Sequence, residues 1–242
     1  MHPTAMQNGE AFFAIYSKFF TGSSVTVIDI GAQDVNGSLK QVCPGSFNYI
    51  GVDFQDAKGV DVVLNDPYKL PFEDESVDIV LSSSCFEHSE MFWISFLEIL
   101  RVLKPNGIFY LNAPSDGSIH TYPVDCWRFY PDCGQALVKW AKRNDFDPVL
   151  LECYTQIGGL WQDYVAVFLK DRSLEEKFND RILKYKTDFE NGRVSYSETL
   201  FNPATSTQNE RQLRSRTVKG IFKKLMLIDL VRRALTPTPP RP

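Results

Sequence analysis

Residues 27–39 read VIDIGAQDVNGSL, an apolar run that ends in Asp29 and continues into a glycine-containing loop. This pattern is typical of a β-strand that leads into a ligand-binding loop. Gly31 follows the acid by two residues, but Gln33 stands where a GxGxxG loop needs its second glycine. Because that glycine lets the backbone approach a pyrophosphate, its absence argues against a dinucleotide. The sequence also lacks a GxxxxGK[ST] segment, which argues against nucleoside triphosphates.

The composition is that of a folded protein with reduced thiols. The chain has 242 residues, 43% of them hydrophobic, and a formal net charge of −4. The hydrophobic fraction is large enough for a buried core. Because the net charge is negative, general binding to polyanions is not expected. Five cysteines without a CxxC pair argue against a disulfide framework and a cysteine-based zinc site. We expect no signal peptide, no membrane span and a cytoplasmic location.

Apolar runs alternate with helical patterns along the first 170 residues. The predicted strands are 24–30, 47–53, 59–64, 76–84, 107–113, 148–155 and 163–170. The predicted helices are 8–20, 91–105 and 131–144. Such alternation predicts an α/β protein with a Rossmann-like, doubly wound, mostly parallel seven-stranded sheet. The last two runs lack a helix between them, so we expect an antiparallel last strand in a hairpin at one edge.

The character of the chain changes after Lys170. We expect a domain over 1–170 and a C-terminal helical extension over 171–235, followed by a disordered Pro-rich tail, 236–242. Within the extension, the sequence predicts a charged helix over 171–190, a loop over 191–208 and a basic amphipathic helix over 210–235. That last helix could dock on the domain or on a second subunit, or bind a membrane surface. Nucleic acid is not expected, because few aromatic residues are interleaved with the charges.

Two acids near strand ends indicate which ligand the first loop binds. Asp53 ends the second strand, where a carboxylate can accept both hydroxyls of a ribose. Asp29 supplies a carboxylate that suits an ammonium group. Asn65 and Asp66 follow the third strand, where a side-chain oxygen could accept the amino group of adenine. A ligand with ribose, ammonium and no phosphate is S-adenosylmethionine. The alternatives are that Asp29 caps a helix and that Asp53 is a turn residue.

Two further stretches carry a family resemblance. They are LPFEDESVDIVLSSSCFEH (70–88) and LEILRVLKPNGIFYLNAPS (97–115). In them the chain resembles the class I S-adenosylmethionine-dependent methyltransferases, particularly the small-molecule (methyltransferase-11-like) group related to quinone-biosynthesis enzymes. The resemblance covers about residues 24–130. It implies cofactor contacts at the following positions: Asp29, Gly31, Asp53, Asp66, Ser82 and Ser83. The usual DxGxGxG is here DIGAQDVNG, so we expect Asp34 and Asn36 to contact the amino-acid end of the cofactor.

The candidate catalytic residues are His88, after the fourth strand, and His120, in the loop after the fifth. A hydroxyl acceptor must lose its proton, and histidine is the commonest general base. The residues predicted to bind the acceptor are Tyr122, Asp125, Trp127, Arg128 and Tyr130. Aromatic rings with a few charges suit sugars and polyols, and also aromatic acceptors. Alternatively, the Glu87–His88 pair packs structurally and His120 lies in a surface loop.

The leading hypothesis is a methyltransferase that methylates a hydroxyl of a small molecule or glycan precursor. A carbon or nitrogen acceptor is the first alternative. A non-catalytic protein of the same fold, binding a partner through 210–235, is the second, and a nicotinamide-dependent oxidoreductase is disfavoured by the missing glycine. No metal site is expected, because Asp116 and Asp125 are too few ligands to indicate one.

Overall fold

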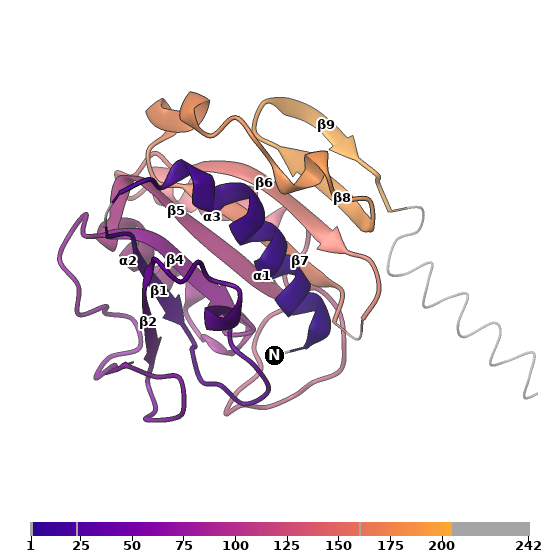
Figure 1. Cartoon of the computed structure of the whole chain (residues 1–242). Coiled ribbons are helices and arrows are strands. Elements are labelled where there is room, and N and C mark those ends of the chain that lie inside the picture. The colour runs from indigo at the N-terminus through magenta and orange to yellow at the C-terminus, as the bar shows by residue number, and fades with distance from the viewer. Residues whose placement is uncertain (1, 23, 160, 205–242) are drawn as a thin grey trace, which may run out of the picture. The chain divides into compact units, whose positions relative to one another are not determined.

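The computed structural model describes residues 2–22, 24–159 and 161–204 (Figure 1). Within these ranges nine strands form one sheet, in the order β3-β2-β1-β4-β5-β7-β6-β8-β9. The strands are β1 Thr26–Ile30, β2 Asn48–Asp53, β3 Val62–Val63, β4 Val77–Ser83, β5 Leu103–Pro114, β6 Val149–Gln156, β7 Asp163–Leu169, β8 Phe189–Val194 and β9 Ser197–Phe201. The strands β1 to β5 run parallel, while β7 is antiparallel to both of its neighbours.

Helices cover both faces of the sheet, which explains why its central strands are buried and mostly apolar. The helix α1 (Pro3–Tyr16) packs on one face with Phe12, Phe13 and Tyr16. The helices α2 (Phe92–Val102) and α3 (Cys133–Lys142) pack on the other. All seven residues of β4 are buried between these layers. No helix in the described ranges is both long enough and apolar enough to span a bilayer.

The predicted Rossmann-like, mostly parallel α/β fold is confirmed, and the seven predicted strands all form. Two expectations after Lys170 are wrong. The segment predicted as a helix, 171–190, contains only the short 3₁₀ helices Arg172–Lys177 and Ile182–Lys184, and its last two residues begin β8. The predicted loop over 191–208 contains most of the hairpin β8–β9, which extends the sheet beyond the predicted seven strands.

The antiparallel pair β6–β7 is consequently not at an edge, because β8 pairs with β6. The sheet also continues past the predicted domain boundary at residue 170, as far as Phe201. The basic amphipathic helix predicted for 210–235 and the tail 236–242 lie outside the described residues.

A buried carboxylate holds the start of this extension against the sheet. Glu152 of β6 accepts hydrogen bonds from the Tyr16 hydroxyl at 2.6 Å and from the backbone amides of Ile182 and Leu183 at 2.7 and 2.9 Å. The neighbouring Arg181, also buried, donates to the carbonyl of Leu151 at 3.0 Å. These hydrogen bonds add to the apolar contacts of Phe178 and Ile182 and stabilise one position of the segment.

A second buried polar network joins α1 to the middle of the sheet. The Asn8 amide donates to the Asn112 side chain at 3.1 Å, and the Tyr154 hydroxyl donates to Asn8 at 3.0 Å. All three residues are fully buried. Because a buried amide without partners destabilises the fold, these bonds fix the rotation of α1 about its axis.

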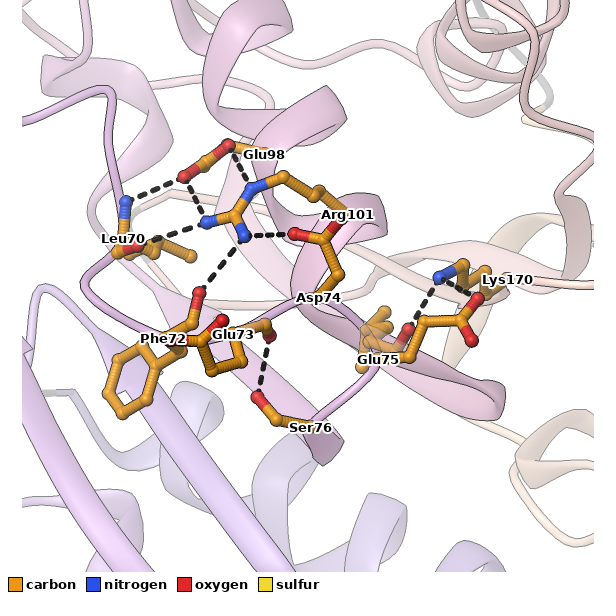
Figure 2. Close-up of polar contacts among 10 residues, drawn as sticks. Leu70, Phe72, Glu73, Asp74, Glu75, Ser76, Glu98, Arg101 and Lys170 are labelled. Atoms are coloured by element: carbon orange, nitrogen blue, oxygen red, sulfur yellow. Dashed lines mark hydrogen bonds and ion pairs between the residues drawn. The ribbon is translucent and has the colours of Figure 1, made fainter.

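The LPFEDES and RVLKP stretches meet around Arg101 of α2 (Figure 2). The guanidinium group donates twice to Glu98, at 2.6 and 2.9 Å, and once to Asp74, at 2.6 Å. It also donates to the carbonyls of Leu70 and Phe72, both at 3.0 Å. This part of the motif therefore ties the segment before β4 to α2, and has a structural role.

Candidate functional site

Two adjoining pockets lie at the carboxyl ends of β1, β2 and β4, where parallel sheets bind ligands. Their volumes are about 170 and 220 Å³. Residues that line both are Gly31, Asp53, Phe54, Cys85 and His88. The smaller pocket continues toward the loop after β1, and the larger one toward the residues after β3.

The loop after β1 begins at Gly31, which needs to be glycine for two reasons. Its φ of +82° is unfavourable for other residues, and a Cβ there would lie 2.5 Å from the Cβ of Cys85. Its backbone amide donates to the carbonyl of Val52 at 2.9 Å. The chain can therefore pass close to the ligand pocket at this point.

Asp53 and Ser83 present polar groups to the pockets. Asp53 is the last residue of β2, and its carboxylate accepts a hydrogen bond from the Gln55 amide at 3.1 Å. The Ser83 hydroxyl lines the smaller pocket and is buried without a hydrogen-bond partner among the described residues. A buried hydroxyl without a hydrogen bond lowers the stability of the fold, unless a ligand forms that hydrogen bond. Gly31, Asp53 and Ser83 are thus the predicted cofactor residues that the structure brings together.

Four of the other predicted cofactor residues lie on loops beside the pockets without lining them. Asp34 accepts from the Gly37 amide at 2.8 Å and pairs with Lys58 at 2.7 Å. The remaining three, all exposed, are Asn36, Asn65 and Asp66. Although Asp66 is outside the pocket lining, Leu64 and Tyr68 on either side of it contribute to the larger pocket.

Ser82 and Asp29 are buried inside the sheet. Ser82 belongs to β4, and the carboxyl group of Asp29 accepts a hydrogen bond from the Tyr49 hydroxyl. Burial raises the pKa of Asp29 to about 7. Asp29 therefore lies behind the loop that begins at Gly31, and not in the lining of either pocket.

The raised pKa of Asp29 makes stability depend on pH. Between the ordinary aspartate pKa of 3.8 and about 7, the folded protein keeps a proton that the unfolded chain releases, so rising pH favours unfolding. From about pH 5 to pH 7 we expect the free energy of unfolding to fall by about 2 kcal/mol more in the wild type than in Asp29→Asn. Urea titrations at both pH values measure this. Asp56→Asn, at an exposed site, should behave as the wild type, and equal slopes for wild type and Asp29→Asn would refute the prediction.

The loop after β5 is held in place by an ion pair. Arg128 donates to both carboxylate oxygens of Asp125, at 2.6 and 2.8 Å, and to the carbonyl of Ser118 at 3.0 Å. The guanidinium group keeps the pKa of the Asp125 carboxyl well below its usual range. Asp125 also accepts from the backbone amide of His120 at 2.8 Å. These two predicted acceptor residues therefore shape the loop and position His120.

The other three predicted acceptor residues differ in their surroundings. The Tyr122 hydroxyl donates to Gln33 at 2.5 Å, which connects the loop after β5 to the loop after β1. The Trp127 indole donates to the Ser89 carbonyl at 2.8 Å and packs against Phe92. Tyr130 is half-exposed. The bond between Tyr122 and Gln33 was not predicted, because nothing in the sequence links positions 89 residues apart.

The two candidate bases lie side by side. The rings of His88 and His120 have centroids 4.9 Å apart, and the second ring also contacts Trp161 at 4.4 Å. The Nδ1 of His88 contacts the carbonyl of Val124, which can only accept, so Nδ1 carries the proton and Nε2 is the basic nitrogen. Burial lowers the pKa of His120.

Glu87 joins this pair and was not predicted to be functional. Its carboxylate lies 3.7 Å from the Nε2 of His88, and burial raises its pKa to about 8. Ligand atoms of Glu87, His88 and His120 all lie within 4.8 Å of one another. The adjacency of Glu87 and His88 in the sequence was the only signal for this cluster, because His120 comes from a separate loop.

Known proteins share parts of this sequence. Residues 8–111 match the family model described as "Methyltransferase domain". The chain is 33% identical over 96 residues to phthiotriol/phenolphthiotriol dimycocerosates methyltransferase 1 of Mycobacterium ulcerans, covering 38% of this chain and 31% of that one. It is 38% identical over 71 residues to the corresponding methyltransferase of Mycobacterium tuberculosis, covering 28% and 25%. The chain thus aligns with less than a third of the length of these relatives.

Two solved structures show the same fold. One is the Burkholderia thailandensis 1,6-didemethyltoxoflavin-N1-methyltransferase, solved with S-adenosylhomocysteine, at a TM-score of 0.50 and 16% identity over 69% of this chain and 78% of that one. The other is the CMeT domain of the citrinin polyketide synthase, at a TM-score of 0.51 and 14% identity over 70% and 53%.

The match over residues 8–111 confirms the resemblance to the class I S-adenosylmethionine-dependent methyltransferases that the motifs predict. The predicted cofactor, S-adenosylmethionine, agrees with this family match. The predicted roles of individual residues remain predictions.

Proposed function

We propose that this protein transfers the methyl group of S-adenosylmethionine to a hydroxyl group of a small molecule or a glycan precursor. The observation that carries this proposal is the pair of pockets at the carboxyl ends of β1, β2 and β4, with His88 in the lining of both. The cofactor supplies an electrophilic methyl group on a positively charged sulfur. The chain has to bind that cofactor, align the acceptor and remove a proton.

In this proposal the polar groups at the strand ends hold the cofactor. Asp53 accepts hydrogen bonds from the ribose hydroxyls, and the buried Ser83 hydroxyl gains the partner that it lacks among the described residues. The backbone at Gly31 approaches the ligand where a side chain would collide with Cys85. Four predicted residues would contact the cofactor only after a rearrangement of their loops: Asp34, Asn36, Asn65 and Asp66. The buried Asp29 and Ser82 would support the pocket without touching the cofactor.

The two histidines are the proposed general bases. As the acceptor oxygen bonds to the methyl carbon, the carbon–sulfur bond breaks and its electron pair stays on sulfur. The hydroxyl proton passes to an imidazole nitrogen. The Nε2 of His88 suits this step because its Nδ1 is already committed to Val124. The lowered pKa of His120 also favours a neutral ring that can accept a proton. Tyr122, Trp127 and Tyr130, with the Asp125–Arg128 pair behind them, would form the walls of the acceptor site.

Calorimetry with S-adenosylmethionine tests the cofactor assignment. We expect micromolar binding by the wild type and about 10- to 100-fold weaker binding by Asp53→Ala, because hydrogen bonds to a carboxylate contribute about 1.5–3 kcal/mol. Asp56→Ala removes an exposed acid from the same loop and should bind as the wild type does. Release of S-adenosylhomocysteine with sugars, glycans and other alcohols then identifies the acceptor.

Absence of binding by folded wild-type protein would contradict the proposal and favour a non-catalytic binding protein. Equal weakening in Asp53→Ala and Asp56→Ala would contradict the assigned ribose site. Turnover only with amines or carbon nucleophiles would keep the cofactor site and overturn the hydroxyl acceptor.

A further inference from the structure

We propose that Glu87, His88 and His120 form a binding site for a divalent transition-metal ion, with Zn²⁺ as the best match. The sequence alone predicts no metal site, because Asp116 and Asp125 are too few ligands to indicate one. The structure instead gathers a carboxylate and two imidazoles from two loops that meet at the pocket. Two histidines and one glutamate are a known set of protein ligands for catalytic zinc, with a further position left for a substrate.

The distances are close to those that an ion requires. One ligand atom from each residue lies within 4.8 Å of the others, and the pair His88 Nε2–Glu87 Oε1 is 3.7 Å apart. Zinc binds nitrogen and oxygen at about 2.0–2.2 Å, so ligand atoms around it are separated by roughly 3.3 Å. Side-chain movements of about 1 Å would therefore complete the site.

The surroundings of His88 match those of a metal ligand. Its Nδ1–H faces the carbonyl of Val124, which fixes the ring orientation and leaves the lone pair of Nε2 pointing away. Histidines that bind metals almost always donate their other N–H to a carbonyl or carboxylate in this way. On the opposite side, Asp125 holds the backbone of His120 in position.

An independent observation comes from polar atoms that lack partners. Glu87 is only 1% exposed, yet its Oε2 has no hydrogen-bond partner among the described residues. The Nδ1 of His120 also makes no hydrogen bond, although it lies 3.4 Å from the Oδ2 of Asp125. The nearby cation, Arg128, already pairs with both oxygens of Asp125. A bound cation would therefore compensate a buried carboxylate that the described protein groups leave incomplete.

The role of the ion, though not its binding, rests on the proposed function. An imidazole that coordinates a metal cannot also accept a proton. In the metal-bound protein the acceptor hydroxyl would bind the ion at its open position. The ion would lower the pKa of the hydroxyl, so that its proton passes to solvent water instead of to an imidazole. The site lies beside the pocket that His88 shares with the cofactor residues, so both groups could be bound together.

Metal binding is measured on the 242-residue chain after chelator treatment and dialysis. We expect one Zn²⁺ per chain by calorimetry, and with Co²⁺ the intense visible absorption of a four-coordinate site. Glu87→Gln and His120→Ala should each weaken Zn²⁺ binding by at least about tenfold. His2→Asn removes the remaining histidine of the chain, outside the cluster, and should leave binding unchanged.

Circular dichroism confirms that each variant is folded. If Glu87→Gln and His120→Ala bind Zn²⁺ as the wild type does, the ion binds elsewhere and the inference is overturned. Absence of Zn²⁺ binding by the wild type would overturn it too. S-adenosylmethionine binding, measured on the same samples, separates the two proposals. If the wild type binds Zn²⁺ but not S-adenosylmethionine, the proposed function alone is contradicted. If it binds S-adenosylmethionine but not Zn²⁺, the metal site alone is contradicted.

Discussion

Replacing Arg101 by methionine is expected to lower the free energy of unfolding by about 3 kcal/mol. Methionine keeps much of the apolar stem but removes all five hydrogen bonds of the guanidinium group shown in Figure 2. The Glu98 carboxylate would lose both bonds from its cation, and the carbonyls of Leu70 and Phe72 would lose their donor. Because 29% of the Arg101 side chain is exposed, water can replace part of this network, and the estimate stays at the low end for a buried pair.

Urea-induced unfolding measures this loss, and a second arginine provides the control. Arg172 pairs with Asp147 at 3.4 Å, and both side chains are largely exposed. Arg172→Met should therefore cost less than about 1 kcal/mol. If the two variants lost the same stability, the network around Arg101 would not be what joins the segment before β4 to α2.

Replacing Gly31 by alanine is expected to weaken S-adenosylmethionine binding by about 10- to 100-fold, because displacing the loop would leave hydrogen bonds to the ligand unmade, at about 1–3 kcal/mol. The added Cβ would lie 2.5 Å from the Cβ of Cys85 and 2.7 Å from its sulfur, and the φ of +82° disfavours alanine. Either the loop or Cys85 must move, and both line the two pockets in which we propose that the cofactor binds. Calorimetry measures the affinity, and thermal unfolding reports the accompanying strain.

A second substitution separates the collision from the backbone strain. In Gly31→Ala/Cys85→Gly the side chain that collides is absent, so at least tenfold of the lost affinity should return, consistent with a positional cause. Gly45→Ala is the matched control, because a Cβ there meets no atom within 4 Å. No recovery in the double variant would mean that the φ of residue 31, and not its contact with Cys85, determines binding.

The sequence predicted the parallel part of the sheet because its central strands, β1, β4 and β5, are buried on both faces and therefore read as apolar runs. It did not predict β8 and β9, whose burial is intermittent and whose pairing depends on β6, more than thirty residues earlier in the chain. The charged stretch that begins at Asp171 favoured a helix. Its actual path depends on bonds to Glu152 and Leu151, which no local pattern encodes.

Prediction of the site had the same limit. Residues at strand ends could be assigned to one edge of the sheet from topology alone, and Asp53, Ser83 and His88 lie there. The conformation of the long loop after β5 could not be derived, because it depends on the pairing of Asp125 with Arg128 and on the contact between Tyr122 and Gln33. The grouping of Glu87 with both histidines follows from that loop conformation.

The polar network of Asn8 has a practical consequence for dividing this chain. The family match ends at residue 111, but the bonding partners of Asn8 are Asn112 and Tyr154, beyond that limit. A segment ending there would also separate β5 from β7, leaving a long apolar edge strand open to self-association. A recombinant fragment intended to stay monomeric should therefore keep α1 at its beginning and extend at least through the hairpin that ends at Phe201.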